Sequence, residues 1–304
     1  MVRAASQLLR SIRAQDGLRA GSLLVTIFGD AIAPRGRVVA LSSLIAAGRL
    51  FGITERHART AVGRLAHDGW IDPQRIGRLS FYRLSNSGAR RFAEATGRIY
   101  GPPARAWDGR WTLLALPPVT AAIRERTREE LSLLGFGQLR NGLFVHPAPF
   151  NAEVEALLKR LGLGEQIVAM RAEAVAGLPD SEIAQQAWDL AQLEARYRRF
   201  IRMFAPLVEA IGADRDLGGD AAFVVRILLI HEYRRIHLRD PMLPSSLLPA
   251  NWVGREAHQL CRLLYARTFR PAERFMSATL RNAHGPLPAA EPAIYQRFGG
   301  LAAR

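Results

Sequence analysis

Hydrophobic residues near the start of the chain recur at helical spacing, and this spacing changes to the alternation of a strand after position 69. The helical spacing predicts three helices, over residues 22–32, 38–51 and 54–68. Thr54 precedes the third helix and is a typical N-cap residue. The stretch "GWIDPQRIGRLSFYRLS" at 69–85 predicts a hairpin that turns at Gly77, and a fourth helix follows Ser85. Three helices, a two-stranded wing and a closing helix are typical of a winged helix-turn-helix.

A second pattern begins after the Pro- and Gly-rich stretch "GPPARAWDG" at 101–109. It predicts a strand, a helix, one or two strands, a second helix and a closing strand, over residues 110–117, 121–136, 137–147, 151–164 and 166–174. This order of elements fits a small ferredoxin-like domain. Farther on the spacing is helical again, which predicts helices over about 180–212, 220–238 and 252–270.

The hydrophobic pattern therefore predicts an α+β chain of several parts. The predicted parts are an N-terminal arm (1–20), a winged helix-turn-helix (21–100), a linker (101–109), a ferredoxin-like domain (110–178) and a helical C-terminal domain (179–304).

Positive charge is concentrated in the first third of the chain. The whole sequence has a net charge of +15, and residues 1–100 contain 16 Arg against 6 Asp and Glu, a local excess of +10. This excess favours a polyanionic partner, because neutralisation of phosphates dominates the affinity of proteins for nucleic acids. A solvated basic surface is the alternative interpretation.

The single cysteine, Cys261, excludes an internal disulfide and a cysteine-based zinc site. No leader-like segment opens the chain, and its apolar runs are too short or too interrupted to span a bilayer. We therefore expect a cytoplasmic protein without a membrane partner.

The third predicted helix has an apolar stripe formed by Ala58, Val62 and Leu65. Its opposite face is basic, and an exposed basic helix can enter a major groove, where Arg reads guanine. Arginines beside the hairpin turn can reach a minor groove or flanking phosphates. The predicted DNA-binding residues are Arg37, Arg56, His57, Arg59, Thr60, Arg64, Arg75 and Arg78. A winged helix that contacts another protein, with solvated arginines, is the alternative.

The segment "RILLIHEYRRIHLRD" at 226–240 places arginines in and directly after an apolar helix. Buried or half-buried arginines need anionic partners. Glu232 and Asp240 are candidates for these partners, and the phosphates of a ligand are the alternative. The predicted ligand-binding residues are Arg226, His231, Tyr233, Arg234, Arg235, Arg239 and Trp252.

The usual catalytic signatures are missing from the sequence, which has no P-loop, no GxSxG and no HExxH. His231 and His237 are six residues apart on a predicted helix and do not share a face, so they do not predict a metal site. We expect no enzymatic activity, no catalytic residue, no metal and no resident cofactor.

Segments along nearly the whole chain resemble the PaaX-like repressors of phenylacetate degradation. They are "FGD" (28–30), "DGWIDPQRIGRLSFYRLSNSG" (68–88), "AWDGRW" (106–111), "GFG" (135–137), "YRRIHLRDPMLPSSLLPANWVG" (233–254), "QLC" (259–261) and "QRFGGL" (296–301). The long segment near the C-terminus is more specific than a helix-turn-helix alone.

The resemblance implies an N-terminal winged helix, a central Cas2-like domain, and a helical C-terminal domain for dimerisation, effector binding or both. It implies a homodimeric transcriptional repressor that binds operator DNA through residues 54–68 and 70–84. It also implies that an acyl-CoA, which is phenylacetyl-CoA in this family, releases the repressor from the DNA. A relative that responds to another acyl-CoA or aromatic effector is the alternative. A Cas2-like nuclease is not expected, because the first central strand ends at Leu116 and Pro117 without a carboxylate. A protein-interaction scaffold stays open as a third hypothesis.

Overall fold

The computed structural model describes residues 3–16, 18–101, 106–212 and 217–301. The chain divides into two compact units, each of which is described by itself. The first consists of residues 1–102, 199–237 and 256–304, and the second of residues 103–198 and 238–255. Of the predicted linker at 101–109, residues 102–105 lie outside the described part.

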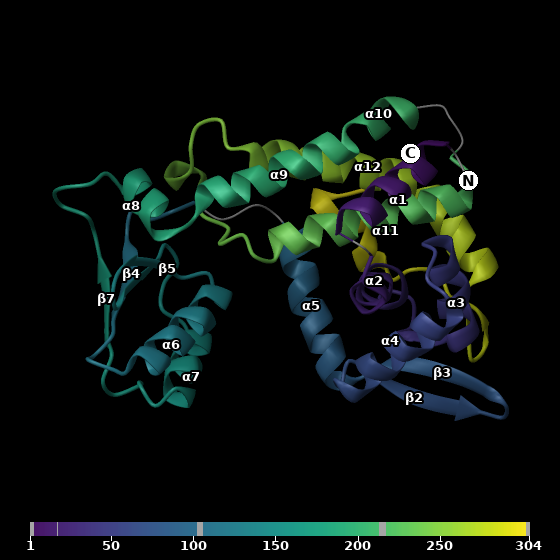
Figure 1. Cartoon of the computed structure of the whole chain (residues 1–304), viewed down its shortest axis with the longest axis horizontal. Coiled ribbons are helices and arrows are strands. Elements are labelled where there is room, and N and C mark those ends of the chain that lie inside the picture. Colours follow the sequence, from purple (N-terminus) through teal and green to yellow (C-terminus); the bar gives the residue numbers. More distant parts are fainter. Residues whose placement is uncertain (1–2, 17, 102–105, 213–216, 302–304) are drawn as a thin grey trace. The chain divides into compact units, whose positions relative to one another are not determined.

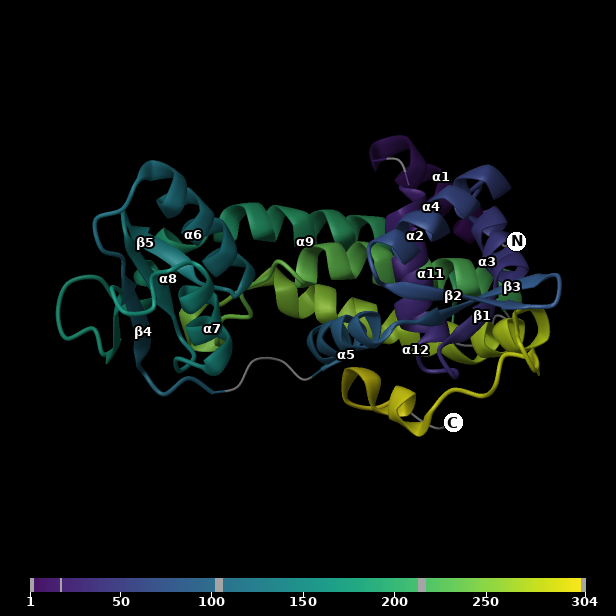
Figure 2. The same ribbon diagram turned by 90° about the horizontal axis from the view of Figure 1, so that it is seen from below.

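The first unit begins with helices and a three-stranded antiparallel sheet of order β1-β3-β2 (Figures 1 and 2). Its elements are α1 (Arg3–Asp16), α2 (Ala20–Ile27), the π-helix η1 (Phe28–Ile32), β1 (Val38–Ala40), α3 (Leu41–Leu50), α4 (Glu55–His67), β2 (Ile71–Ile76), β3 (Leu79–Leu84) and α5 (Asn86–Tyr100). The prediction of one helix over 38–51 is wrong for its first three residues. Val38 pairs with Arg83 of β3, because two β-branched valines suit a sheet edge.

Local signals determine where α4 and α5 begin. The Thr54 hydroxyl accepts a hydrogen bond from the amide of His57 at 3.3 Å, and the Ser85 hydroxyl accepts one from the amide of Gly88 at 2.9 Å. The hairpin between the helices turns at Gly77, whose φ of 59° lies in the left-handed region that favours glycine. These three predictions from the sequence are confirmed.

The second half of the first unit is helical. It contains α10 (Pro206–Ala210), α11 (Gly219–His237) and most of α12 (Val253–Thr279), while α9 (Leu190–Phe204) and α12 include residues of both units. The prediction that the last helix ends at residue 270 is wrong, because α12 continues through Pro271. Proline removes one helical hydrogen bond, but the buried side chains of Ala272 and Met276 keep the next turns packed. Within the described residues, no helix is long and apolar enough to cross a membrane.

The end of the chain returns to the N-terminal elements of the same unit. It forms the short strands β8 (Arg281–Asn282) and β9 (Gly285–Pro286) and the 3₁₀ segment η3 (Pro292–Gly299). The amide of Arg281 donates to the Ser43 hydroxyl at 2.9 Å, and the amide of Glu291 donates to the carbonyl of Pro34 at 2.8 Å. Figure 2 shows this segment in yellow beneath the elements around β1.

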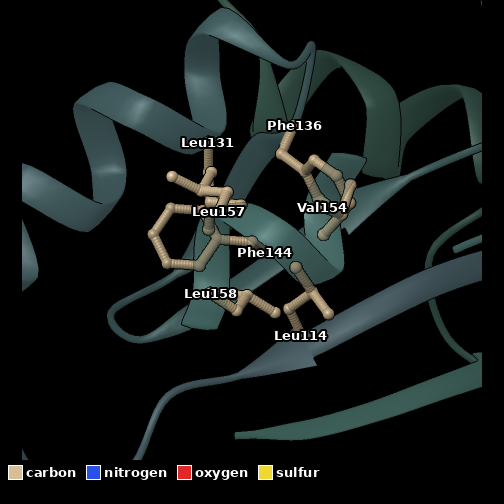
Figure 3. Packing of buried hydrophobic residues seen from close by; sticks show 7 residues of the cluster. All are labelled: Leu114, Leu131, Phe136, Phe144, Val154, Leu157 and Leu158. Carbon is tan, nitrogen blue, oxygen red and sulfur yellow. The ribbon is translucent and has the colours of Figure 1, made fainter. Parts of the chain in front are cut away.

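The second unit contains a four-stranded antiparallel sheet of order β5-β6-β4-β7. Its elements are β4 (Trp111–Ala115), α6 (Ala121–Leu133), β5 (Gly137–Arg140), β6 (Leu143–His146), α7 (Ala152–Arg160), β7 (Val168–Ala172), α8 (Asp180–Ala187) and η2 (Ser245–Leu247). The order strand–helix–strand–strand–helix–strand, with the first and third strands adjacent, is the ferredoxin-like topology. Helices α6 and α7 cover one face of the sheet (Figure 1). The side chains of Leu114, Leu131, Phe144 and Leu157 pack between these helices and the sheet (Figure 3).

Candidate nucleic-acid interface and ligand residues

Helix α4 buries one face and exposes the other. Its buried residues are Ala58, Ala61, Val62 and Leu65. The exposed residues include all five that were predicted to contact DNA, namely Arg56, His57, Arg59, Thr60 and Arg64. A Cβ atom added at Gly63 would meet nothing within 4 Å, so the fold of this unit does not itself require a glycine there.

An exposed carboxylate orders one end of this helix face. Glu55 accepts from Arg59 at 2.8 Å and from Arg49 at 3.1 Å. The hydrogen bond from Arg59, followed by the charge of the same guanidinium, lowers the pKa of Glu55. Thr60 is also engaged, since its hydroxyl donates to the carbonyl of Arg56 at 3.0 Å. Exposed ion pairs of this kind are weak, so the two arginines can exchange the Glu55 carboxylate for another anion.

The hairpin of β2 and β3 places both predicted wing arginines at its exposed tip. Arg75 pairs with Ser80 across the hairpin, and its Nε donates to the carbonyl of Gly77 at 3.4 Å. Arg78 is in the turn itself and is exposed. Leu79 is 62% exposed beside them, so the tip presents an apolar as well as a cationic surface.

Arg37 lies outside α4 and the β2–β3 hairpin. It directly precedes the edge strand β1, and its carbonyl accepts a hydrogen bond from the amide of Leu84 on β3 at 2.9 Å. It is exposed, and its φ of 63° is in a region that residues other than glycine rarely adopt. It lines two cavities of the first unit, of about 180 and about 510 Å³. The eight predicted DNA-binding residues are therefore all exposed within one unit.

The predicted ligand residue Arg226 lies in the fully buried centre of α11 and has anionic partners other than those the sequence suggested. Its Nε donates to Asp30 and its Nη1 to Glu273, both at 2.7 Å, and its Nη2 donates to the Tyr265 hydroxyl at 2.8 Å. Asp30 in turn accepts from Arg297 at 2.7 Å.

Asp30 is the centre of this buried ionic cluster. The hydroxyls of Tyr100 and Tyr265 also donate to it, at 2.8 and 2.9 Å. Burial by itself raises the pKa of the Asp30 carboxyl, but the charges of Arg226 and Arg297 outweigh burial and hold the pKa below its usual value. Burial also lowers the pKa of Arg35, which pairs with Glu273. The cluster thus holds three guanidinium groups against two carboxylates.

Asp30, Arg297, Glu273 and Arg35 were not among the residues predicted from the sequence. Two signals for them were present, because "FGD" at 28–30 places a carboxylate inside an apolar helical segment and "QRFGGL" at 296–301 places an arginine beside apolar residues. Neither signal indicates that the two segments meet.

His231 and Arg234 bind to helix α2 within the first unit. The Nδ1 of His231 lies 3.0 Å from the Thr26 hydroxyl, and Arg234 donates to the same hydroxyl at 2.8 Å and to the carbonyl of Ser22 at 2.8 Å. Burial, together with the charges of Arg234 and Arg235, lowers the pKa of His231 to about 3. The imidazole is therefore neutral and structural at neutral pH.

The remaining predicted ligand residues are divided between the units. Tyr233 is buried with its hydroxyl 3.0 Å from Nδ1 of His258, and Trp252 is buried against Tyr197 in the second unit. Arg239, also in the second unit, is exposed. Arg235 is 45% exposed and lies 3.3 Å from Glu232, one of the two carboxylates that the sequence suggested.

The other suggested carboxylate, Asp240, accepts from the Tyr197 hydroxyl at 2.7 Å. Among the described residues, no group of three or more His, Cys, Asp or Glu side chains is placed to hold a metal ion.

Sequence comparison divides the chain into three matched parts. Residues 19–88 match the family described as PaaX-like protein, residues 104–184 match the PaaX protein central Cas2-like domain, and residues 188–278 match the PaaX-like protein C-terminal domain. The match of the central part agrees with the topology of the second unit, so the predicted Cas2-like domain is confirmed.

Two relatives match most of the chain. The transcriptional repressor PaaX of Escherichia coli (strain K12) is 38% identical over 284 residues, which cover 92% of this chain and 90% of the relative. The solved structure of the uncharacterized protein Rv0674 from Mycobacterium tuberculosis is 26% identical with a TM-score of 0.51, and covers 76% of this chain and 90% of its own. The E. coli relative is a regulator and not an enzyme, in agreement with the prediction of no catalytic activity.

Proposed function

The chain belongs to the PaaX-like family, and on that premise we propose that it is a sequence-specific DNA-binding repressor of genes for phenylacetate catabolism. One observation carries the proposal. The predicted base-reading residues of α4 are all exposed on one helix face, and the hairpin that follows exposes Arg75 and Arg78 at its tip. A helix and hairpin of this kind form a winged helix-turn-helix.

The chemistry of this surface suits duplex DNA. Arg56, Arg59 and Arg64 can donate in bidentate fashion to guanine, and the short side chains at Thr60 and Gly63 leave room for close approach to a base edge. The arginines of the wing suit backbone phosphates, which fix orientation and carry no sequence information. The repressor acts as a homodimer in the cytoplasm, with two recognition helices on a pseudo-palindromic operator.

A mobility-shift titration on the DNA upstream of the protein's own gene cluster tests this function. Arg56→Ala and Arg59→Ala should each weaken specific binding by about 10- to 100-fold, the loss expected for one bidentate base contact. Arg270→Ala, which removes an exposed arginine of α12 in the same unit, is the matched control and should bind like the wild type. Wild-type binding by the two α4 variants would instead favour a protein-interaction scaffold.

The effector in this proposal is phenylacetyl-CoA, which releases the repressor because it binds one form of the protein better than the DNA-bound form. Of the predicted ligand arginines in the first unit, Arg226 and Arg234 are engaged inside the fold, whereas Arg235 keeps a half-exposed guanidinium. We assign Arg235 as a contact of the coenzyme A phosphates. A phosphate group of coenzyme A competes with the Glu232 carboxylate for this guanidinium.

Calorimetry with phenylacetyl-CoA and the variant Arg235→Ala tests the effector separately from DNA binding. The variant should lose about tenfold or more in affinity for the thioester, since a charge-assisted contact is removed. Unchanged affinity would refute the assignment of Arg235. Release of DNA by a different thioester or by a free aromatic acid, and not by phenylacetyl-CoA, would refute the choice of effector and leave the repressor.

A further inference from the structure

The three-stranded sheet of β1, β3 and β2 is called the wing sheet below. The larger cavity of the first unit lies where this sheet meets the C-terminal hairpin of β8 and β9. Its volume is about 510 Å³, and residues of β1, β2, β3, the start of α5 and the β8–β9 turn line it. The polar side chains among them are Arg37, Gln74, Arg83, Asn86, Asn282 and His284. Residues that are almost 250 positions apart in the sequence therefore share one cavity.

The lining of this cavity has the chemistry of an anion site. It contains two guanidinium groups, one imidazole and three side-chain amides, and no Asp or Glu is among its described residues. Asp72 is the cross-strand neighbour of Arg83 but forms no ion pair with it in the described part of the chain. Planar guanidinium groups and amide donors are the groups that proteins use to hold phosphate.

The backbone around the cavity adds to this preference. Asn86 is the first residue of α5, a helix of 15 residues, so the positive end of that helix borders the cavity. Gly36 and Arg37 both have left-handed φ values, of 76° and 63°. This turn holds the backbone of Arg37 beside Val38 at the sheet edge, in a conformation that arginine rarely adopts.

One hydrogen bond joins the C-terminal hairpin to α3, and others close the hairpin itself. The amide of Arg281 donates to the Ser43 hydroxyl on α3 at 2.9 Å, and the amide of Leu287 donates to the carbonyl of Leu280 at 3.0 Å. In the turn, the amide of His284 donates to Oδ1 of Asn282 at 2.8 Å. The side chain of His284 is therefore presented from a fixed hairpin.

We infer that this cavity is a phosphate-binding site, in which Arg37, Arg83 and His284 hold a backbone phosphate of the bound DNA. The inference rests on the proposed function and adds the C-terminal hairpin to the DNA-binding surface. DNA is favoured as the source of the phosphate, because Gln74 and Ile76 of the wing hairpin border the same cavity and lead directly to Arg75 and Arg78 at the tip. The C-terminal hairpin of β8 and β9 then acts as a second wing.

Arg83→Gln and His284→Gln test the inference, because both keep a polar side chain and remove the guanidinium or the imidazole that is assigned to the phosphate. Fluorescence anisotropy measures their affinity for the upstream duplex and for an unrelated duplex, between about 50 and 200 mM salt. Arg83→Gln should weaken binding to both duplexes about 5- to 10-fold and lower the salt slope by about one, as expected for a lost phosphate contact. His284→Gln should weaken both to a smaller extent. Arg270→Gln is the matched control for charge, and thermal melting by circular dichroism checks the fold of every variant.

Several outcomes would overturn the inference. If the wild type binds the upstream duplex and both variants match it in affinity and in salt slope, the cavity does not contact DNA, although the proposed function stands. If the variants bind DNA normally but lose affinity for free coenzyme A in calorimetry, the cavity holds a phosphate of the effector and the assignment to DNA is wrong. If the wild type shows no specific binding, the inference and the proposed function both fail.

Discussion

Replacement of Asp30 by asparagine is the sharpest test of how the first unit is held together. Asp30 is fully buried and accepts four hydrogen bonds, from Arg226, Arg297, Tyr100 and Tyr265, at 2.7–2.9 Å. Asparagine has nearly the same shape, so Asp30→Asn removes the charge without opening a cavity. It also replaces one acceptor oxygen by an NH₂ group that faces other donors.

The expected loss of stability follows from what remains buried after the change. Three guanidinium groups would share a single carboxylate, that of Glu273, in place of two. Removal of one partner of a buried ion pair costs about 3–5 kcal/mol, because the other charge stays desolvated and uncompensated. In a unit of this size that corresponds to a fall in the melting temperature of about 6–20 °C.

Differential scanning calorimetry measures this change, and hydrogen exchange localises it to η1, α11 and η3 of the first unit. Glu55→Gln is the matched control, since it also removes a carboxylate that binds two arginines, Arg49 and Arg59, but at the exposed surface. Water and salt screen that pair, so its loss should shift the melting temperature far less. Equal shifts for the two variants would refute the claim that burial makes the Asp30 cluster important.

Three further predictions concern glycine positions and pH. Gly63→Ala should stabilise the protein by up to about 1 kcal/mol in urea unfolding, because alanine favours a helix and a Cβ there has free space. The same variant should weaken operator binding, and unchanged binding would mean that this part of α4 does not approach DNA. Gly88→Ala should unfold more easily by several kcal/mol, because its Cβ would lie 2.1 Å from the carbonyl oxygen of Trp70. Burial lowers the pKa of His231 to about 3 and of His237 to about 4, whereas a histidine of the unfolded chain has a pKa of about 6.5. Between these pH values, only the unfolded chain binds protons at the two imidazoles. Stability should be highest above pH 6.5 and fall by about 1.4 kcal/mol per pH unit for each imidazole as the pH drops toward 4, and a flat profile from pH 7 to 5 would refute this.

The DNA-binding surface was predictable because its signals are local. The N-caps Thr54 and Ser85, the turn at Gly77 and the apolar stripe of α4 all act within a few residues of the chain. Helical periodicity then decides which side chains face the solvent. The exposed basic face of α4 follows from spacing alone.

Predictions failed where distant parts of the chain decide the outcome. The valines at 38–39 were predicted as helical, but they form a strand because β3, more than 40 residues later, supplies hydrogen bonds to them. Helix α12 continues through Pro271 because Phe275 packs on Phe223 of α11, with ring centroids 5.2 Å apart. A proline in a single helix would favour a stop.

The amino-acid sequence was sufficient to place most helices and strands, to locate the positive charge near the N-terminus and to show the family resemblance. The partners of the buried charges became known from the folded chain. Arg226 was predicted to bind a ligand phosphate or a nearby carboxylate, yet it pairs with Asp30, 196 positions before it. Charge and helical spacing indicate that a buried arginine needs an anion, but the fold alone selects which carboxylate comes close enough, because that choice depends on packing between segments far apart in the chain.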